Sequence, residues 1–405
     1  MIAVQIIFSV SLLLLAHTYI AYPLLLKIRS FFYSHSAKPT IPNFPFVSIL
    51  IPAYNEEKVI GKKIQSILAS NYPFEKIEIL IGSDASTDGT NEIVKTFSNV
   101  KLIEFKGRIG KPAIINNLSK LAKNEILILT DANVMFDKNT IQELTKNFQN
   151  PEIALVDSKM INLNEQNPGV SKAEGTYVRG EVGIKNNEGK IFGLMMGPFG
   201  GCYALRKKFY TPVPENFLVD DFYINMKVLE KGGKSISEMN AKVFEEVNSN
   251  WKIEFKRKIR IATGSFQNLF AFSHLIFKFN TLAFCFISHK VLRWLGPFFM
   301  ISLYLSNTAL LLNIINTGVF KNNHTYSEIL FYFNPELLFI LVSFVLQNIL
   351  ILLFILDLLL LSININLPTT RLATHFLSTN VALVIGFLKF LRGVKSSVWQ
   401  PTSRT

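Results

Sequence analysis

Long apolar runs at both ends of the chain enclose a polar middle segment. The first 26 residues and much of the stretch after Thr281 are apolar, whereas the residues between them combine short apolar runs with helical patterns. Hydrophobic residues make up 49% of the 405 residues. Charged residues make up only 18%, against roughly 25% in ordinary soluble domains. This segregation predicts a soluble domain held between membrane anchors.

The first apolar run, residues 2–26, carries no charge and is long enough to span a bilayer. A signal peptide would have basic residues before the run and a small-residue cleavage site after it. Here Lys27 and Arg29 follow the run instead. Because the basic flank of a span tends to stay cytoplasmic, we expect residues 1–33 to be an uncleaved anchor with its N-terminus outside.

Residues 34–250 are predicted to form an α/β domain. Three short apolar runs, at 47–54, 77–84 and 125–133, are typical of buried parallel strands, and amphipathic stretches such as 57–70 lie between them. This alternation predicts a Rossmann-like, mostly parallel sheet. Such sheets bind ligands beyond the carboxyl ends of their strands, where polar motif residues stand in this sequence.

The remaining residues are predicted to belong to the membrane part. Residues 251–290 begin with an amphipathic helix that fits the membrane interface, because its aromatic face is opposite a face with Arg257 and Arg260. Residues 291–392 contain three candidate spans, and residues 393–405 form a basic tail. The candidate spans are 295–316, 334–361 and 372–391.

The number of crossings stays open at this point. With the soluble domain inside, three full C-terminal spans would put the tail outside, although its basic residues favour the inside. Either one segment is interfacial or re-entrant, or a break near Asn334-Pro335 divides the middle one. The basic residues in question are Lys389, Arg392, Lys395 and Arg404.

The net charge of +13 fits two kinds of partner. Nucleic-acid binding is one, and attraction to anionic lipid headgroups is the other. The second explains why the basic clusters flank apolar segments, so no nucleic-acid partner is expected. Cys202 and Cys285 form neither a disulfide framework nor a zinc-site spacing.

Polar motifs follow each predicted strand. Pro52 to Glu56 end the first strand, and Asp84 to Thr90 end the second. A carboxylate at this edge can accept a hydrogen bond from a nucleobase such as uracil, although Ser86, Thr87 and Asp88 would also cap the next helix. Two such motifs at successive strand ends favour a functional site.

The third strand ends in Asp131-Ala132-Asn133, whose oxygen ligands two residues apart suit a hard divalent ion. A turn with a capping Asn is the structural alternative. Lys111 precedes this strand and could contact the base or a phosphate, although a solvated loop lysine would look the same. Asp220 and Asp221 begin a later helix and could supply a general base, or simply compensate the helix dipole.

Taken in order, these motifs over residues 47–267 resemble the membrane-bound family 2 glycosyltransferases with a GT-A fold. That pattern combines an acidic strand-end motif, a DxD-like metal site, an acidic pair containing the base, and Q/R-x-x-R-W on an interfacial helix. Cellulose, chitin, hyaluronan and poly-N-acetylglucosamine synthases share it, as does ceramide glucosyltransferase. The resemblance implies inverting sugar transfer from a nucleotide diphosphate, with UDP-linked glucose or N-acetylglucosamine as donor and Mg²⁺ or Mn²⁺ as cofactor.

The resemblance also assigns roles to residues. Asp221 would be the base with Asp220 beside it, and Asp131 and Asn133 would hold the metal ion. Two larger sets complete the expected site: Pro52, Tyr54, Glu56, Asp84, Asp88, Lys111, Asp131, Arg257 and Arg260 for the donor, and Gly200, Gly201 and Cys202 on the acceptor side.

Two departures from the family pattern affect the acceptor. Ile261 stands where the family has Trp, which argues against processive polymer synthesis, and Arg257 is the variant found in lipid-glucosylating members. Two classes of acceptor therefore remain candidates. A polysaccharide or oligosaccharide is slightly favoured over a lipid (polyprenyl phosphate or ceramide-like). A transporter is disfavoured because the sequence shows neither paired membrane repeats nor helices broken at the midplane. A non-catalytic scaffold is disfavoured because the acids at Asp84, Asp131 and Asp221 are all present.

Overall fold

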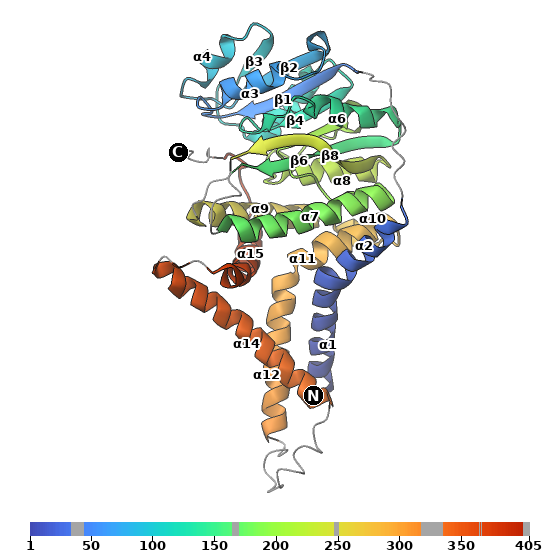
Figure 1. Cartoon of the computed structure of the whole chain (residues 1–405), viewed down its shortest axis with the longest axis vertical. Coiled ribbons are helices and arrows are strands. Elements are labelled where there is room, and N and C mark those ends of the chain that lie inside the picture. The colour runs from blue at the N-terminus through green and yellow to red at the C-terminus, as the bar shows by residue number, and fades with distance from the viewer. Residues whose placement is uncertain are drawn as a thin grey trace.

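The computed structural model describes residues 1–33, 44–163, 170–246, 251–316, 335–363, 365 and 367–399. An α/β domain rests on a layer of helices that lie across its base, and long apolar helices extend from that layer (Figure 1). Four parts of the sequence prediction lie outside the described residues: the boundaries at 34 and 250, Asn334, and Arg404.

Eight strands of the described residues form one sheet in the order β3-β2-β1-β4-β7-β6-β8-β5. The first four of that order are parallel, β7 is antiparallel to both of its neighbours, and β6 and β8 are again parallel. The predicted mostly parallel sheet is therefore confirmed. The strands are β1 Val47–Ala53, β2 Ile77–Ser83, β3 Val100–Glu104, β4 Ile126–Thr130, β5 Met135–Phe136, β6 Ile153–Asn162, β7 Cys202–Arg206 and β8 Lys234–Glu245.

Helices cover both faces of this sheet, which is why the central strands are apolar at successive positions rather than at every second one. Ile49 and Ile51 of β1 pack in one core with the helices on one face, and Leu50 packs in a second core on the other. The helices of the first face are α3 Ile60–Leu68, α4 Thr90–Lys95 and α6 Thr140–Lys146, and those of the second are α5 Lys111–Leu121 and α8 Asp220–Glu230.

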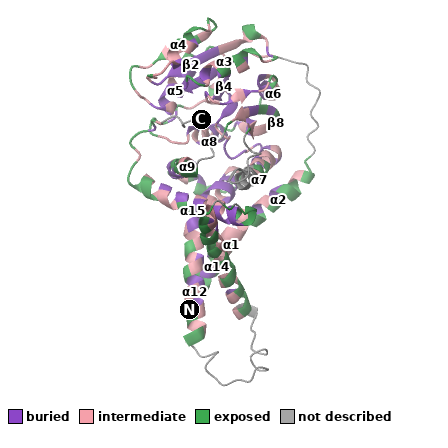
Figure 2. Cartoon of the chain, turned by 60° about the vertical axis from the view of Figure 1, so that its left-hand side comes forward, coloured by how far each residue is buried: buried purple, intermediate pink, exposed green. Residues whose placement is uncertain are grey.

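Two long helices lie under the domain, α7 Val170–Phe192 and α9 Trp251–Ala271, and α9 coincides with the predicted amphipathic helix. The short α10 Thr281–Cys285 and α11 Leu292–Trp294 continue this layer. Figure 2 shows buried residues concentrated in the α/β domain, whereas the long helices below it carry many exposed ones.

Four helical stretches of the described residues are long and apolar enough to cross a membrane. The first, Ile2–Phe31, includes α1 Ile2–Ala16 and α2 Tyr22–Phe31. The others are α12 Gly296–Asn316, a window of α14 Pro335–Ser362, and α15 Pro368–Leu391, which correspond to the three predicted spans. Their outward side chains are apolar, as lipid contact requires: Leu346 and Leu352 of α14 are 60% and 62% exposed.

The last helix, α15, lies along α9. Near its end, the ring of Phe387 is 5.1 Å from that of Phe266, and Phe390 contacts Phe266 and Phe270 of the same helix. Near its start, residues of both helices line one cavity. The closest approach is at Gly386, where a Cβ would lie 2.6 Å from the Cβ of Ala262 and 2.8 Å from the backbone nitrogen of Thr263.

This contact predicts that Gly386→Ala destabilises the protein. The added methyl would have to push α15 away from the backbone of α9, and overpacking of this kind costs about 1–3 kcal/mol. Unfolding can be followed with a thiol-reactive dye, because Cys202 and Cys285 are both buried. Gly180→Ala in α7 is the matched control, since a methyl group added there would meet nothing within 4 Å. Equal unfolding temperatures for the two variants would contradict the prediction.

Candidate active site

The ends of the strands bring acidic residues from distant parts of the sequence to one basic side chain. Nζ of Lys111, at the start of α5, lies 2.7 Å from Oδ1 of Asp131, directly after β4. The same nitrogen lies 3.9 Å from Oδ1 of Asp220, at the start of α8. We call Lys111, Asp131, Asp220 and Asp221 the acidic centre.

The charges of the acidic centre shift one another's pKa values. Burial lowers the pKa of Lys111, but the Asp131 and Asp220 carboxylates outweigh it and raise this pKa above its ordinary value, so Lys111 is a cation. Burial and the Asp220 carboxylate raise the pKa of Asp221 to about 6, although Lys111 acts in the opposite direction. A carboxylate with such a pKa can take up a proton near neutral pH.

A glycine turn holds the predicted base from the other side. Gly200 has φ +84°, and a Cβ there would lie 2.3 Å from Oδ2 of Asp221, so no other residue fits without displacing this carboxylate. A Cβ at Gly201 would lie 2.2 Å from Cε of Met160. Of the predicted acceptor-side glycines, Gly200 is therefore packed against the acidic centre and Gly201 against Met160.

Cys202 does not lie in the acceptor-side position that the sequence predicts for it. It is the first residue of β7, its side chain is 1% exposed, and it packs in the core beneath the sheet. Burial raises the pKa of its thiol to about 12. The thiol thus faces away from any acceptor.

Asp157 of β6 supports the same turn and was missed by sequence reasoning. Its oxygens accept from the backbone N–H of Phe199 at 3.4 and 3.2 Å. Burial raises the pKa of Asp157 to about 7, although Lys185 lowers it. The Lys185 ammonium lies 3.8 Å from the centre of the Phe199 ring. A carboxylate directly after the apolar run 153–156 was the available signal.

The predicted nucleoside residues meet around Arg108, which sequence reasoning also missed. Its guanidinium carbon lies 3.2 Å from the centre of the Tyr54 ring, and its Nε donates to Oδ2 of Asp84 at 3.0 Å. Asp84 is fully buried and also accepts from the backbone N–H groups of Ile109 at 2.7 Å and Gly110 at 3.2 Å. Asp84 therefore fixes the loop that leads to Lys111, and a nucleobase would have to share its oxygens with these donors.

Three other predicted donor residues position the strand-end loops. Asp88 accepts from the backbone N–H groups of Thr90 at 3.1 Å and Glu57 at 3.2 Å, and the N–H of Glu56 donates to Oγ1 of Thr90 at 2.8 Å. Pro52 lies within β1, opposite Gly82 of β2. These bonds tie the loop after β1 to the loop after β2. Asp88 thus holds the two loops in position at the start of α4. Its contact with a donor stays a prediction.

Helix α9 holds the segment that precedes Asp220. Gln267 accepts from the N–H of Leu218 at 3.0 Å, and Asn268 donates to the carbonyl of Val219 at 3.0 Å. Arg260 donates to the Leu218 carbonyl at 3.4 Å, whereas Arg257 pairs with Glu254 on its own helix at 3.2 Å. Of the two predicted arginines, Arg260 is thus the one next to the acidic centre.

The predicted metal ligands fit a cation that the donor helps to hold. The described residues contain no group of three His, Cys, Asp or Glu side chains with metal-site geometry, and Asn133 donates to Oε1 of Glu245 at 2.9 Å. However, Oδ2 of Asp220 is buried without a hydrogen-bond partner, which leaves negative charge at the acidic centre uncompensated. Mg²⁺ is commonly bound by one or two carboxylates plus substrate phosphates, and Asp131 can fill that role.

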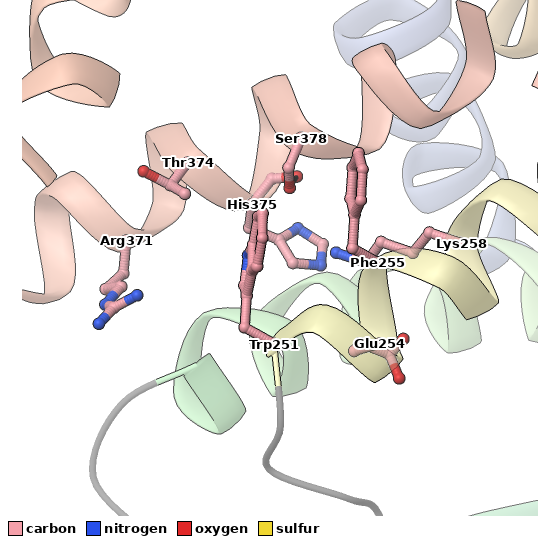
Figure 3. Close-up of a pocket in the computed structure, with 8 residues that line it drawn as sticks. All are labelled: Trp251, Glu254, Phe255, Lys258, Arg371, Thr374, His375 and Ser378. Atoms are coloured by element: carbon pink, nitrogen blue, oxygen red, sulfur yellow. Dashed lines mark hydrogen bonds between the residues drawn. The ribbon is translucent and has the colours of Figure 1, made fainter. Parts of the chain in front are cut away.

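A separate cavity lies between the first turns of α9 and the start of α15 (Figure 3). The rings of Trp251 and Phe255 line it from α9, stacked 5.3 Å apart, together with the basic Lys258. Arg371 and His375 line it from α15. Its lining therefore combines aromatic rings with basic side chains at the level where the apolar helices begin.

Comparison with known proteins identifies the domain. The family model described as "Glycosyl transferase family 2" matches residues 48–211, the part of the chain that contains β1, β2, β4 and the glycine turn. Residues 48–211 form a family 2 glycosyltransferase domain. This confirms the resemblance on which the site residues were predicted.

Named relatives extend the match. Over 262 residues the chain is 24% identical to the probable glycosyltransferase YdaM of Bacillus subtilis, covering 60% of each chain. Over 128 residues it is 30% identical to the beta-monoglucosyldiacylglycerol synthase of Nostoc sp., covering 30% of this chain and 27% of that protein. The matches thus span less than two thirds of either curated relative.

A solved structure matches almost the whole chain. The mannosyltransferase PcManGT from Pyrobaculum calidifontis, in complex with GDP-Man and Mn²⁺, superposes with a TM-score of 0.64 at 18% identity. The superposition covers 95% of this chain and 99% of that one. It confirms the predicted GT-A-type fold with a helical C-terminal region.

The raised pKa of Asp221 predicts the pH dependence of sugar transfer. Protonated Asp221 cannot accept a proton, so kcat/KM should fall as the pH drops through about 6 and reach a plateau above it. The profile can be measured with any donor that supports turnover. Asp157→Asn is the control, because it removes the other raised carboxyl group of this region; loss of the acidic limb in that variant would contradict the assignment to Asp221.

Proposed function

We propose that this chain is an inverting glycosyltransferase that transfers a hexosyl group from a nucleotide diphosphate sugar to an acceptor at the cytoplasmic membrane face. The observation that carries this proposal is the acidic centre at the carboxyl edge of a family 2 domain. There a cation for the diphosphate and a carboxylate with a pKa of about 6 lie side by side. This pairing is what displacement of a diphosphate by a hydroxyl requires.

In the proposed reaction, Asp221 accepts the proton of an acceptor hydroxyl while that oxygen attacks the anomeric carbon. The bond to the diphosphate oxygen breaks on the opposite face, and the configuration inverts. Lys111 and Arg260 stabilise the negative charge that the leaving diphosphate gains. A divalent cation held by Asp131 and Asn133 would supply further charge neutralisation there. Gly200 packs directly against Asp221 and so holds the base in position on the side proposed for the acceptor.

The donor class is proposed as UDP-linked glucose or N-acetylglucosamine, from the family resemblance. The structural neighbour holds GDP-Man, so GDP-mannose belongs in any test of donors. Tyr54 and Arg108 form a stacked surface at the expected position of the base, and stacking accepts a pyrimidine or a purine.

The acceptor is proposed as a saccharide, with a lipid as the second candidate. The lipid is supported by the start of α9, where the aromatic Trp251 and Phe255 lie beside the basic Lys258, since such side chains suit the level of anionic headgroups. The match to a beta-monoglucosyldiacylglycerol synthase supports this candidate as well.

The path of α15 supports a proposal for how the chain crosses the membrane. Helix α15 lies along α9 and leads to a segment on the α/β domain, so we do not count it as a membrane crossing. The three other candidate spans, Ile2–Phe31, α12 and α14, are then the crossings. An odd number of crossings would place Met1 outside and the domain and the C-terminus inside. Of the alternatives that the sequence left open, we therefore favour an interfacial last segment.

Asp221→Asn should abolish transfer while leaving the donor bound. Loss of a general base typically lowers the rate about 10²- to 10⁴-fold. Membranes or purified protein would be tested with radiolabelled UDP-glucose, UDP-N-acetylglucosamine and GDP-mannose, each with Mg²⁺, Mn²⁺ or chelator. Organic extraction separates a lipid product from a water-soluble one.

The control for this experiment is Glu75→Gln, which neutralises an exposed carboxylate before β2. Normal turnover of Asp221→Asn with any donor would contradict the proposed role of Asp221. The absence of transfer from every donor by a folded wild-type protein would contradict the proposed function itself.

Orientation can be tested with single cysteines. In sealed vesicles with the outer face exposed, an impermeant maleimide should label Ile2→Cys but not Ser396→Cys, and detergent should make both reactive. The native Cys202 and Cys285 are buried and give a low background. Labelling of Ser396→Cys before detergent would show that α15 crosses the membrane.

A further inference from the structure

The segment after α15 turns back onto the α/β domain. Gly393 has φ +84°, which ends the helix in the left-handed conformation that glycine adopts at low cost. Beyond it, the carbonyl of Val394 accepts from Nδ2 of Asn216 at 3.1 Å, and Oγ of Ser397 donates to the carbonyl of Glu215 at 2.6 Å. The segment is therefore attached to the loop that precedes Asp220. We call residues 394–399 the C-terminal strap.

The strap ends at the predicted nucleoside residues. The ring of Trp399 lies 6.4 Å from that of Tyr54, at 79°, and 5.6 Å from the guanidinium carbon of Arg108. The carbonyl of Trp399 also accepts a hydrogen bond from Nη2 of Arg108. The guanidinium thus contacts two aromatic rings that come from opposite ends of the sequence.

The strap also contacts the loop that carries Lys111. A Cβ at Gly110, which has φ +85°, would lie 2.4 Å from Oγ of Ser397, so the two backbones pack closely. A cavity of about 580 Å³ lies between the strap and this part of the domain. Its lining comes from Arg108, Ile109, Glu215 and Asn216 on the domain and from Lys395 to Val398 of the strap. This volume lies within the range of small-molecule sites, roughly 300–1,000 Å³.

We propose that the C-terminal strap forms one wall of the donor site and that Trp399 contacts the base of a nucleoside diphosphate. This inference rests on the proposed function and adds to it a binding residue outside the family 2 domain. The ring of Trp399 lies almost perpendicular to that of Tyr54, with Arg108 beside both, and an aromatic ring at this position offers a stacking surface to a nucleobase, whichever base it is. The strap then connects donor binding with α15, the helix from which it extends.

Nucleotide binding by the purified full-length chain tests this inference, without any need for turnover. The affinities of UDP, GDP and inorganic pyrophosphate are measured by calorimetry in the presence of Mg²⁺. For Trp399→Ala, and for a chain that ends at Gly393, we expect roughly 5- to 100-fold weaker binding of the nucleotide that the wild type prefers. Trp399→Phe should recover part of the loss. A chain that ends at Trp399 is the matched truncation control and should bind like the wild type.

Pyrophosphate separates a base contact from a merely structural role. It has no base, so Trp399→Ala should bind it as the wild type does, which also shows that the variant is folded. Equal weakening for pyrophosphate and nucleotide would overturn the inference, because Trp399 would then only support the loop of Lys111. Unchanged or tighter nucleotide binding by the chain ending at Gly393 would also overturn it. If the wild type binds neither UDP nor GDP, the proposed function fails and the inference with it.

Discussion

The placement of one ammonium group among three carboxylates governs the arrangement of the rest of the site. Nζ of Lys111 lies 2.7 Å from an oxygen of Asp131 and 3.9 Å from an oxygen of Asp220. Carboxylates gathered in a partly buried site destabilise the fold unless a cation offsets their repulsion. The order of the sheet, with β4 between β1 and β7, brings these groups together from distant positions in the sequence. Asp221 owes its pKa of about 6 to the same neighbourhood.

Much of this arrangement could be predicted from the sequence, because each signal was local. Buried parallel strands appear as continuous apolar runs, and the acids that follow them stand at fixed positions after each run. Arg108 and Trp399 could not be placed in the same way. Arg108 lies in a loop without periodicity, and the position of Trp399 depends on where α15 ends relative to the domain. For Cys202 the local signal was misleading. This residue follows a glycine turn in the sequence, but its side chain packs in the core.

Helix α9 connects the acidic centre with the membrane part. Its polar side holds residues 216–219 through Gln267 and Asn268, and its other side packs on α15 at Gly386. A shift of α15 would therefore be transmitted to the start of α8, where Asp220 and Asp221 lie. The absence of Trp after Arg260 does not weaken this connection, since glutamine and asparagine side chains make the contacts.

A second connection runs through α7. Glu181, Lys185 and Glu188 share one face of this helix, three and four residues apart. Lys185 supports the glycine turn through Phe199, while Glu188 accepts from Tyr22 of α2 at 2.7 Å. Glu181 pairs with a group of basic residues at the start of the membrane part, namely His289, Lys290 and Arg293. Because buried ion pairs are costly to break, the acceptor side of the site is rigidly tied to the first anchor and to the segment before α12. The surroundings of Asp221 are thus linked to the apolar helices by two routes, through α9 to α15 and through α7 to α2 and the segment before α12.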